Sequence, residues 1–178
     1  MGTDNSGQVE VWSSTAKNAR SLGAPGPALG TIAFNRTGSE FVTVSSSGGV
    51  SVWNARDDRV VTSINACPAA ASAEFSPDGR KMVVACGDAT VRVFEAATGQ
   101  TLAVLQASNQ GSVSDASFSP DGKSIVSSVD ARSAGLIEIW NAELTTSSLS
   151  ALEEIADQEV TLKLTAGQVQ QYLNGTGG

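Results

Sequence analysis

Histidine is absent from this chain of 178 residues, and its absence excludes a large group of catalytic sites. Without an imidazole there is no Ser-His-Asp or Cys-His arrangement and no histidine-ligated metal ion. Basic residues are also scarce, with 11 Lys and Arg against 18 Asp and Glu and a net charge of −7. Binding to nucleic acid or to anionic membranes depends on a basic patch. We therefore expect neither nucleic acid nor a membrane as a partner.

Long apolar runs are missing, and cysteine is rare. No stretch approaches the about 20 apolar residues of a membrane-spanning helix, and the N-terminus lacks the apolar region of a secretory signal. The two cysteines, Cys67 and Cys86, have no metal-like spacing and fall at different places in the repeat described below. We expect free, buried or half-buried thiols in a reducing compartment, with a disulfide as the alternative. We also expect a cytoplasmic location and no cofactor.

The remaining candidates for chemistry are explained better as turns. The glycine-containing segment 45–49 lacks the lysine of a phosphate-binding loop. Asp57 and Asp58 are adjacent carboxylates, but they fall in an expected exposed loop. Asp78 and Asp121 each precede a glycine in a turn pattern. We predict no catalytic residue and no metal site.

What the chain does have is a repeat of roughly 40 residues. A turn segment, Phe75-Ser76-Pro77-Asp78-Gly79, has counterparts at 34–38 and 118–122. An alternating strand at 91–94 has counterparts at 9–12, 50–53 and 137–140. These strands end on Trp12, Trp53, Phe94 and Trp140, the first three spaced 41 residues apart and the last 46 residues further on. Such a repeat is typical of proteins in which each unit buries its face on the next.

Each complete repeat predicts four short antiparallel strands joined by short loops. In the best-preserved unit, 70–107, the run 82–86 is apolar throughout, which predicts a strand covered on both faces. The same pattern divides the chain into an incomplete unit at 7–23 and complete units at 29–66, 70–107 and 112–149. Residues 1–6 are expected to form a polar turn before the first repeated strand.

Residues 150–178 depart from the repeat. Apolar residues between Leu149 and Val160 stand at helical spacing, and a second such segment follows Thr165. These patterns predict a tail of short helices with an extended connection at 160–164. We expect this tail to cover an exposed sheet edge. The alternative is a docking peptide for a partner.

The turns, the Val-x-Val-Trp strands and the loop 95–100 together resemble WD40 repeats over residues 7–149. The resemblance implies an all-β fold, a partial β-propeller of about three and a half four-stranded antiparallel blades with a short helical C-terminal tail. It places the four repeated aromatics between blades. In the family a histidine hydrogen-bonds through a buried network to a turn aspartate. That network is incomplete here, so the blades are expected to depend more on apolar packing.

The tail segments 160–165 and 172–173 also resemble the C-terminal ends of bacterial WD40 proteins that follow a signalling ATPase domain. We therefore expect this chain to be the C-terminal sensor part of a larger protein. Since it holds too few blades for a ring, open blade edges also predict self-association.

In WD40 proteins the usual binding face is formed by the loops before the first strand and between the second and third strands. Here that face would present Ser47, Pro68, Asp88, Asn109, Gln110, Asp130 and Arg132. Plain solvated turns are the alternative at each position. The insertion 130–135 is the first choice, because only there does one unit exceed its siblings on this face.

These observations predict a non-catalytic scaffold that binds a protein or peptide through its loops. One alternative is a fragment of a propeller enzyme, hydrolase-like or lactonase-like, whose catalytic residues lie elsewhere. The other is a homo-oligomeric structural protein whose copies close a ring together.

Overall fold

The computed structural model describes residues 2–3, 9–12, 19–22, 29–108, 111–130 and 135–142. They belong to the first of two compact units, Met1–Thr145. All regular structure in the described part is antiparallel β-sheet, which confirms the all-β prediction. The predicted tail helices, and the fourth strand expected near 144–149, lie outside the described residues.

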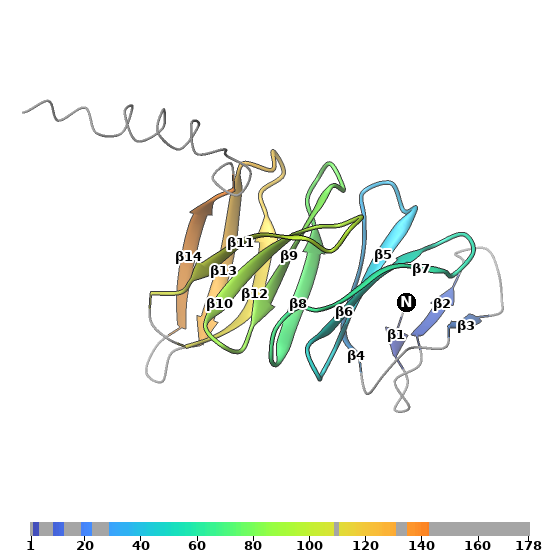
Figure 1. Ribbon diagram of the computed structural model, residues 1–178, viewed down its shortest axis with the longest axis horizontal. Coiled ribbons are helices and arrows are strands. Elements are labelled where there is room, and N and C mark those ends of the chain that lie inside the picture. Colours follow the sequence, from blue (N-terminus) through green and yellow to red (C-terminus); the bar gives the residue numbers. More distant parts are fainter. Residues whose placement is uncertain are drawn as a thin grey trace, which may run out of the picture. The chain divides into compact units, whose positions relative to one another are not determined.

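The strands form four sheets in chain order, and their neighbours within each sheet are neighbours in sequence (Figure 1). The first sheet contains β1 (Gly2–Thr3), β2 (Val9–Trp12) and β3 (Ala19–Leu22). The second blade contains β4 (Leu29–Phe34), β5 (Glu40–Ser45), β6 (Gly49–Asn54) and β7 (Val60–Asn65). The third blade contains β8 (Ala70–Phe75), β9 (Lys81–Cys86), β10 (Thr90–Glu95) and β11 (Thr101–Gln106). The last blade contains β12 (Ser112–Phe118), β13 (Ser124–Asp130) and β14 (Gly135–Asn141).

One local prediction at the N-terminus was wrong. Gly2 and Thr3 do not belong to a turn; they pair with Glu10 and Val9 as strand β1. The backbone hydrogen bonds of a strand partner decide this, and a two-residue segment carries too little sequence pattern to reveal it.

The cores of this structure lie between blades. One buried cluster joins the second blade to the third, with Val42 and Val52 against Met82 and Val84. A second joins the third blade to the last, with Val83 and its neighbours against β12 and β13. Strand β9 contributes to both clusters, which explains its uninterrupted apolar run.

The first strands of successive blades lie next to each other. The Thr31 hydroxyl of β4 donates a 2.9 Å hydrogen bond to the Ala71 carbonyl of β8. In turn, the Ala116 N–H of β12 donates to the Ser72 hydroxyl of β8, at 3.3 Å. The sheets therefore meet at their first strands and stack face on face, as blades of a propeller do.

Hydroxyl groups accept hydrogen bonds from two of the repeated tryptophans, Trp53 and Trp140. The Trp53 indole N–H donates to the Thr43 hydroxyl at 2.9 Å, and the Trp140 N–H donates to the Ser127 hydroxyl at 3.0 Å. In the third blade the aromatic is Phe94, which has no N–H, and Val84 takes the corresponding place on the second strand. Aromatic and partner thus change together, because a buried indole N–H needs an acceptor and a phenyl ring does not. Phe94 belongs to the cluster between the second and third blades, Trp140 packs on the next cluster, and the Trp12 side chain is outside the described residues.

The last blade leaves one apolar face exposed. Ile137 and Ile139 of β14 are 72% and 76% exposed, whereas Val91 and Val93, at the same repeat positions in β10, are fully buried under the last blade. The face that receives a neighbour in the third blade is therefore uncovered in the last one within the described residues.

Candidate functional site

The predicted binding loops gather at one end of the strands, which we call the loop end. It comprises the β5–β6 turn (46–48), the β7–β8 connection (66–69), the β9–β10 turn (87–89), the described part of the β11–β12 connection and the end of β13. The β4–β5, β8–β9 and β12–β13 turns lie at the opposite end of the same strands, which we call the turn end. A six-residue strand such as β9 separates the two ends by about 20 Å.

Tight contacts hold the loop end together between the second and third blades. Gly48 has φ of +91°, and a Cβ there would lie 1.8 Å from the Cys67 carbonyl oxygen. Only glycine fits this close approach. The Gly48 carbonyl accepts the Ala66 N–H, and the Ala69 carbonyl accepts the Gly87 N–H.

A disulfide bond joins Cys67 to Cys86 at the same junction, with 6.0 Å between their Cα atoms. The predicted free thiols were therefore wrong. The different repeat positions of the two cysteines do not keep them apart, since β9 brings its last residue beside the connection that precedes its own blade. The disulfide also removes the free-thiol argument for a reducing compartment.

Ser47 and Pro68 are exposed beside this junction. The Ser47 hydroxyl shares a 2.9 Å hydrogen bond with the Ser45 hydroxyl, so it is oriented by its own turn.

Asp88 is tied into the scaffold. Its carboxylate forms a 2.6 Å ion pair with Arg92 and accepts the Thr90 hydroxyl at 2.5 Å. Arg92 in turn donates to the Ala66 carbonyl of the preceding connection, at 2.7 Å. An arginine thus supplies the hydrogen-bond partner of this turn aspartate in a chain without histidine, and it fastens two blades together.

The loop end continues to the last blade. The Ser112 hydroxyl donates to the Gly87 carbonyl at 3.4 Å, and Glu138, at the repeat position of Arg92, accepts the Ser108 N–H at 2.9 Å. Asp130 is exposed at the end of β13. Asn109, Gln110 and Arg132 lie outside the described residues.

The sequence reading missed Arg92, Glu138 and the cysteine pair. The sequence held part of the signal, since Arg92 and Glu138 occupy one repeat position and each is a charged residue between two apolar ones. What they reach across the blade boundary depends on tertiary packing.

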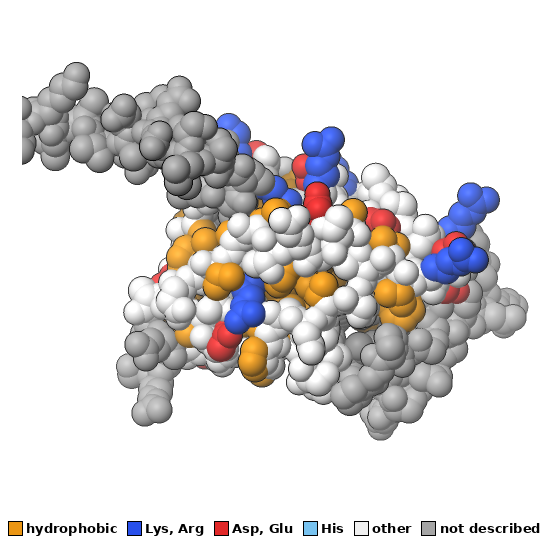
Figure 2. All heavy atoms as spheres, viewed as in Figure 1, with side chains coloured by type: hydrophobic (Ala, Val, Ile, Leu, Met, Phe, Trp, Pro, Cys, Tyr) orange, Lys and Arg blue, Asp and Glu red, His pale blue; other side chains and the backbone are white. Residues whose placement is uncertain are grey.

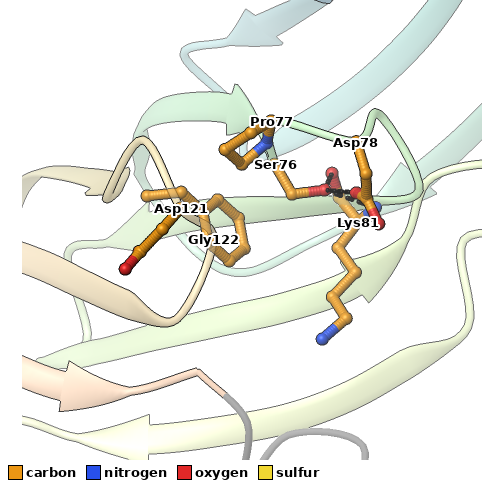
Figure 3. Close-up of a pocket in the computed structure, with 7 residues that line it drawn as sticks. Ser76, Pro77, Asp78, Lys81, Asp121 and Gly122 are labelled. Atoms are coloured by element: carbon orange, nitrogen blue, oxygen red, sulfur yellow. Dashed lines mark hydrogen bonds between the residues drawn. The ribbon is translucent and has the colours of Figure 1, made fainter.

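The turn end is built by local hydrogen bonds. In Figure 3 the Asp78 carboxylate turns toward the Ser76 hydroxyl, which donates to it at 2.6 Å, and Gly122 of the next turn lies beside Pro77. The Ser76 hydroxyl and the Arg80 N–H lower the pKa of Asp78 below its usual range. The equivalent bond from Ser119 lowers the pKa of Asp121. Both aspartates therefore stabilise turns, as predicted for this sequence pattern.

Charge is dispersed over the visible surface. Figure 2 shows Lys and Arg side chains at several separate places on the drawn face, with Asp and Glu side chains among them. Within the described part of the chain, no three His, Cys, Asp or Glu side chains are grouped as metal ligands. The described residues also include no helix long and apolar enough to cross a bilayer.

Comparison with known proteins agrees with this geometry. The sequence pattern of the WD domain, G-beta repeat, matches residues 58–95 and 99–141. The chain therefore contains WD40 repeats in these two segments. The WD repeat-containing protein sll1491 of Synechocystis sp. (strain ATCC 27184 / PCC 6803 / Kazusa) is 33% identical over 89 residues, which are 49% of this chain and 25% of that protein. This chain thus spans a quarter of that relative's length.

A solved structure supports the fold. Kuenenia stuttgartiensis hydrazine synthase superimposes with a TM-score of 0.71 over 79% of this chain and 41% of that chain, at 17% identity. At this identity the similarity shows the fold alone. The WD40 repeats and the stacked blades together support a propeller-type fold, and WD40 repeats generally mediate protein–protein interaction.

Proposed function

We propose that this WD40 chain is a non-catalytic scaffold that binds a protein or peptide at its loop end. The observation that supports this most directly is the bonding across blade boundaries there. The disulfide, the Arg92–Ala66 bond and the Ser112–Gly87 bond hold loops from three blades in fixed positions. Loops on a rigid scaffold bind with little loss of conformational entropy.

The exposed loop side chains have different amounts of freedom. Asp88 is engaged by Arg92, so it supports the surface. Ser47, Pro68 and Asp130 are exposed, and these are the residues that we propose contact a partner, together with Asn109, Gln110 and Arg132 as predicted from the sequence. A sensor role within a larger protein remains a prediction.

Selection of peptides on the purified chain tests this proposal. Peptides selected from a random displayed library should bind wild-type protein, and Asp130→Arg should weaken the binding of most of them. Asp57→Arg is the matched control, because it makes the same charge change on an exposed residue at the other end of the strands. Selected peptides that respond only to Asp57→Arg, or to neither variant, would show that the loop end is not the binding surface.

A further inference from the structure

A depression of about 280 Å³ lies at the turn end, away from the loops discussed above. It is bordered by the ends of the first strands of three blades and by the three turns that follow those strands. Its walls are Phe34, Arg36, Glu74, Phe75, Pro77 and Phe118, with Ser76 and Pro120 completing the rim. Pockets for drug-sized molecules span about 300–1,000 Å³. This one has the size for a single side chain.

The repeat itself shows which of these residues are unusual. Glu74 stands on β8 where the other first strands have Ala33 and Ser117. Arg36 is the second residue of its turn, where both sibling turns have proline. Two charged departures from the repeat, contributed by different blades, therefore line one depression.

The aromatic residue that the second blade contributes to the depression, Phe34, is more exposed than its counterparts in the repeat. Phe34 is 47% exposed, whereas Phe75 and Phe118, at the same repeat position, are 4% and 8% exposed. The Phe34 ring rests edge-on against Phe41, with 5.8 Å between ring centroids. A ring held in this way presents a fixed apolar surface to a ligand.

The two charges have no ion-pair partner among the described residues. Glu74 is half-buried, and both its burial and the nearby charge of Asp115 raise the pKa of its carboxyl. The ionised form of Glu74 therefore lowers stability, since alanine or serine serves the fold at this position in the sibling blades. A cation at the depression would relieve this cost.

We propose that this depression binds the side chain of a lysine or arginine from a peptide partner. Glu74 receives the ammonium or guanidinium group, and the Phe34 ring contacts the alkyl stem or the cation itself. Arg36 donates to a carbonyl or carboxylate oxygen of the same peptide. The net charge of −7 favours a cationic partner over an anionic one.

The test measures binding of Nα-acetyl-lysine methylamide by NMR of the 15N-labelled full chain. We expect fast-exchange shifts of amides near Phe34 and Glu74, with a dissociation constant in the millimolar range. The norleucine analogue, which has the alkyl chain without the ammonium group, should produce shifts at least about tenfold smaller at equal concentration. The amides of the loop end should not respond.

Two variants identify the carboxylate and the guanidinium. Glu74→Gln should weaken binding by about tenfold, as expected for a hydrogen-bonded charge. Arg36→Gln, a change at an exposed residue, should weaken it less. Glu95→Gln is the control, because it removes the same charge from a carboxylate that already accepts the Thr98 hydroxyl.

Three results would overturn the proposal: equal shifts with the norleucine analogue, equal affinity of Glu74→Gln and wild type, or no shifts around Phe34. Tighter binding of 1,5-diaminopentane than of the lysine derivative would assign the depression to free diamines instead of peptides.

Discussion

The buried pair formed by Trp53 and Thr43 allows a quantitative test of how this fold satisfies its tryptophans. The indole N–H and the hydroxyl are 2.9 Å apart. Trp53 is 4% exposed and Thr43 is 2% exposed, so water cannot replace the lost acceptor. In the third blade the corresponding residues are Phe94 and Val84, which have neither the N–H nor the hydroxyl.

Thr43→Val keeps the shape of the side chain and removes the acceptor. The indole N–H is then buried without a partner, which costs about 1–3 kcal/mol of unfolding free energy. In a Trp53→Phe background there is no N–H to satisfy, and Thr43→Val recreates the pairing of the third blade. There the same change should alter stability by less than about 0.5 kcal/mol. The two changes should therefore be coupled by at least about 1 kcal/mol.

Urea unfolding of the four proteins, followed by far-UV circular dichroism, measures this coupling. Circular dichroism is used because Trp53→Phe changes the fluorescence. An equal cost of Thr43→Val in both backgrounds would refute the argument that aromatic and hydroxyl are selected together. A change in m-value would show that the variant alters the unfolded state or the cooperativity of unfolding.

Three further predictions follow from the described contacts. Cys67→Ala should lower the unfolding free energy by about 3 kcal/mol, because the disulfide closes a loop with a sequence separation of 19; wild-type protein in dithiothreitol should match it, and an unchanged urea midpoint in both would contradict the bond. Replacing both Ile137 and Ile139 with lysine should reduce self-association, measured by light scattering as a mass that rises with protein concentration. Val104→Lys, a change at a residue that is 55% exposed, should not reduce it. Loss of self-association in both variants would indicate an effect of net charge instead. The lowered pKa of Asp78 contributes stability that is present above the unfolded value of about 4 and is lost as pH falls below it; the stability difference between wild type and Asp78→Asn should therefore shrink between about pH 4 and pH 2, and a constant difference would count against it.

The strand pattern was predictable because it depends on residues within each strand and recurs in every blade. Alternation in β10 and the continuous apolar run in β9 each reflect which faces are covered. The turn at 76–79 is specified by its own proline, aspartate and glycine, which favour the turn conformation at their positions. Repetition turned these weak signals into a consistent architecture.

The loop end was predictable in position but not in chemistry. Asp88 belongs to a recognisable turn, yet its ion pair depends on Arg92 lying on the adjacent strand. The prediction of free thiols was wrong, because a separation in sequence says little about the distance between a connection and the end of the next blade's second strand.

By itself, the sequence determined that this chain consists of stacked antiparallel blades, that its turns recur and that it has no histidine with which to build common catalytic sites. Hydrophobic periodicity and turn chemistry act over a few residues, so they can be read without coordinates. Only the tertiary structure decided which groups come together between blades. It joins Cys67 to Cys86, brings the Arg92 guanidinium to the Ala66 carbonyl, and places Glu74 and Arg36 around one depression. Those encounters depend on how one sheet is placed against the next, which no local pattern specifies.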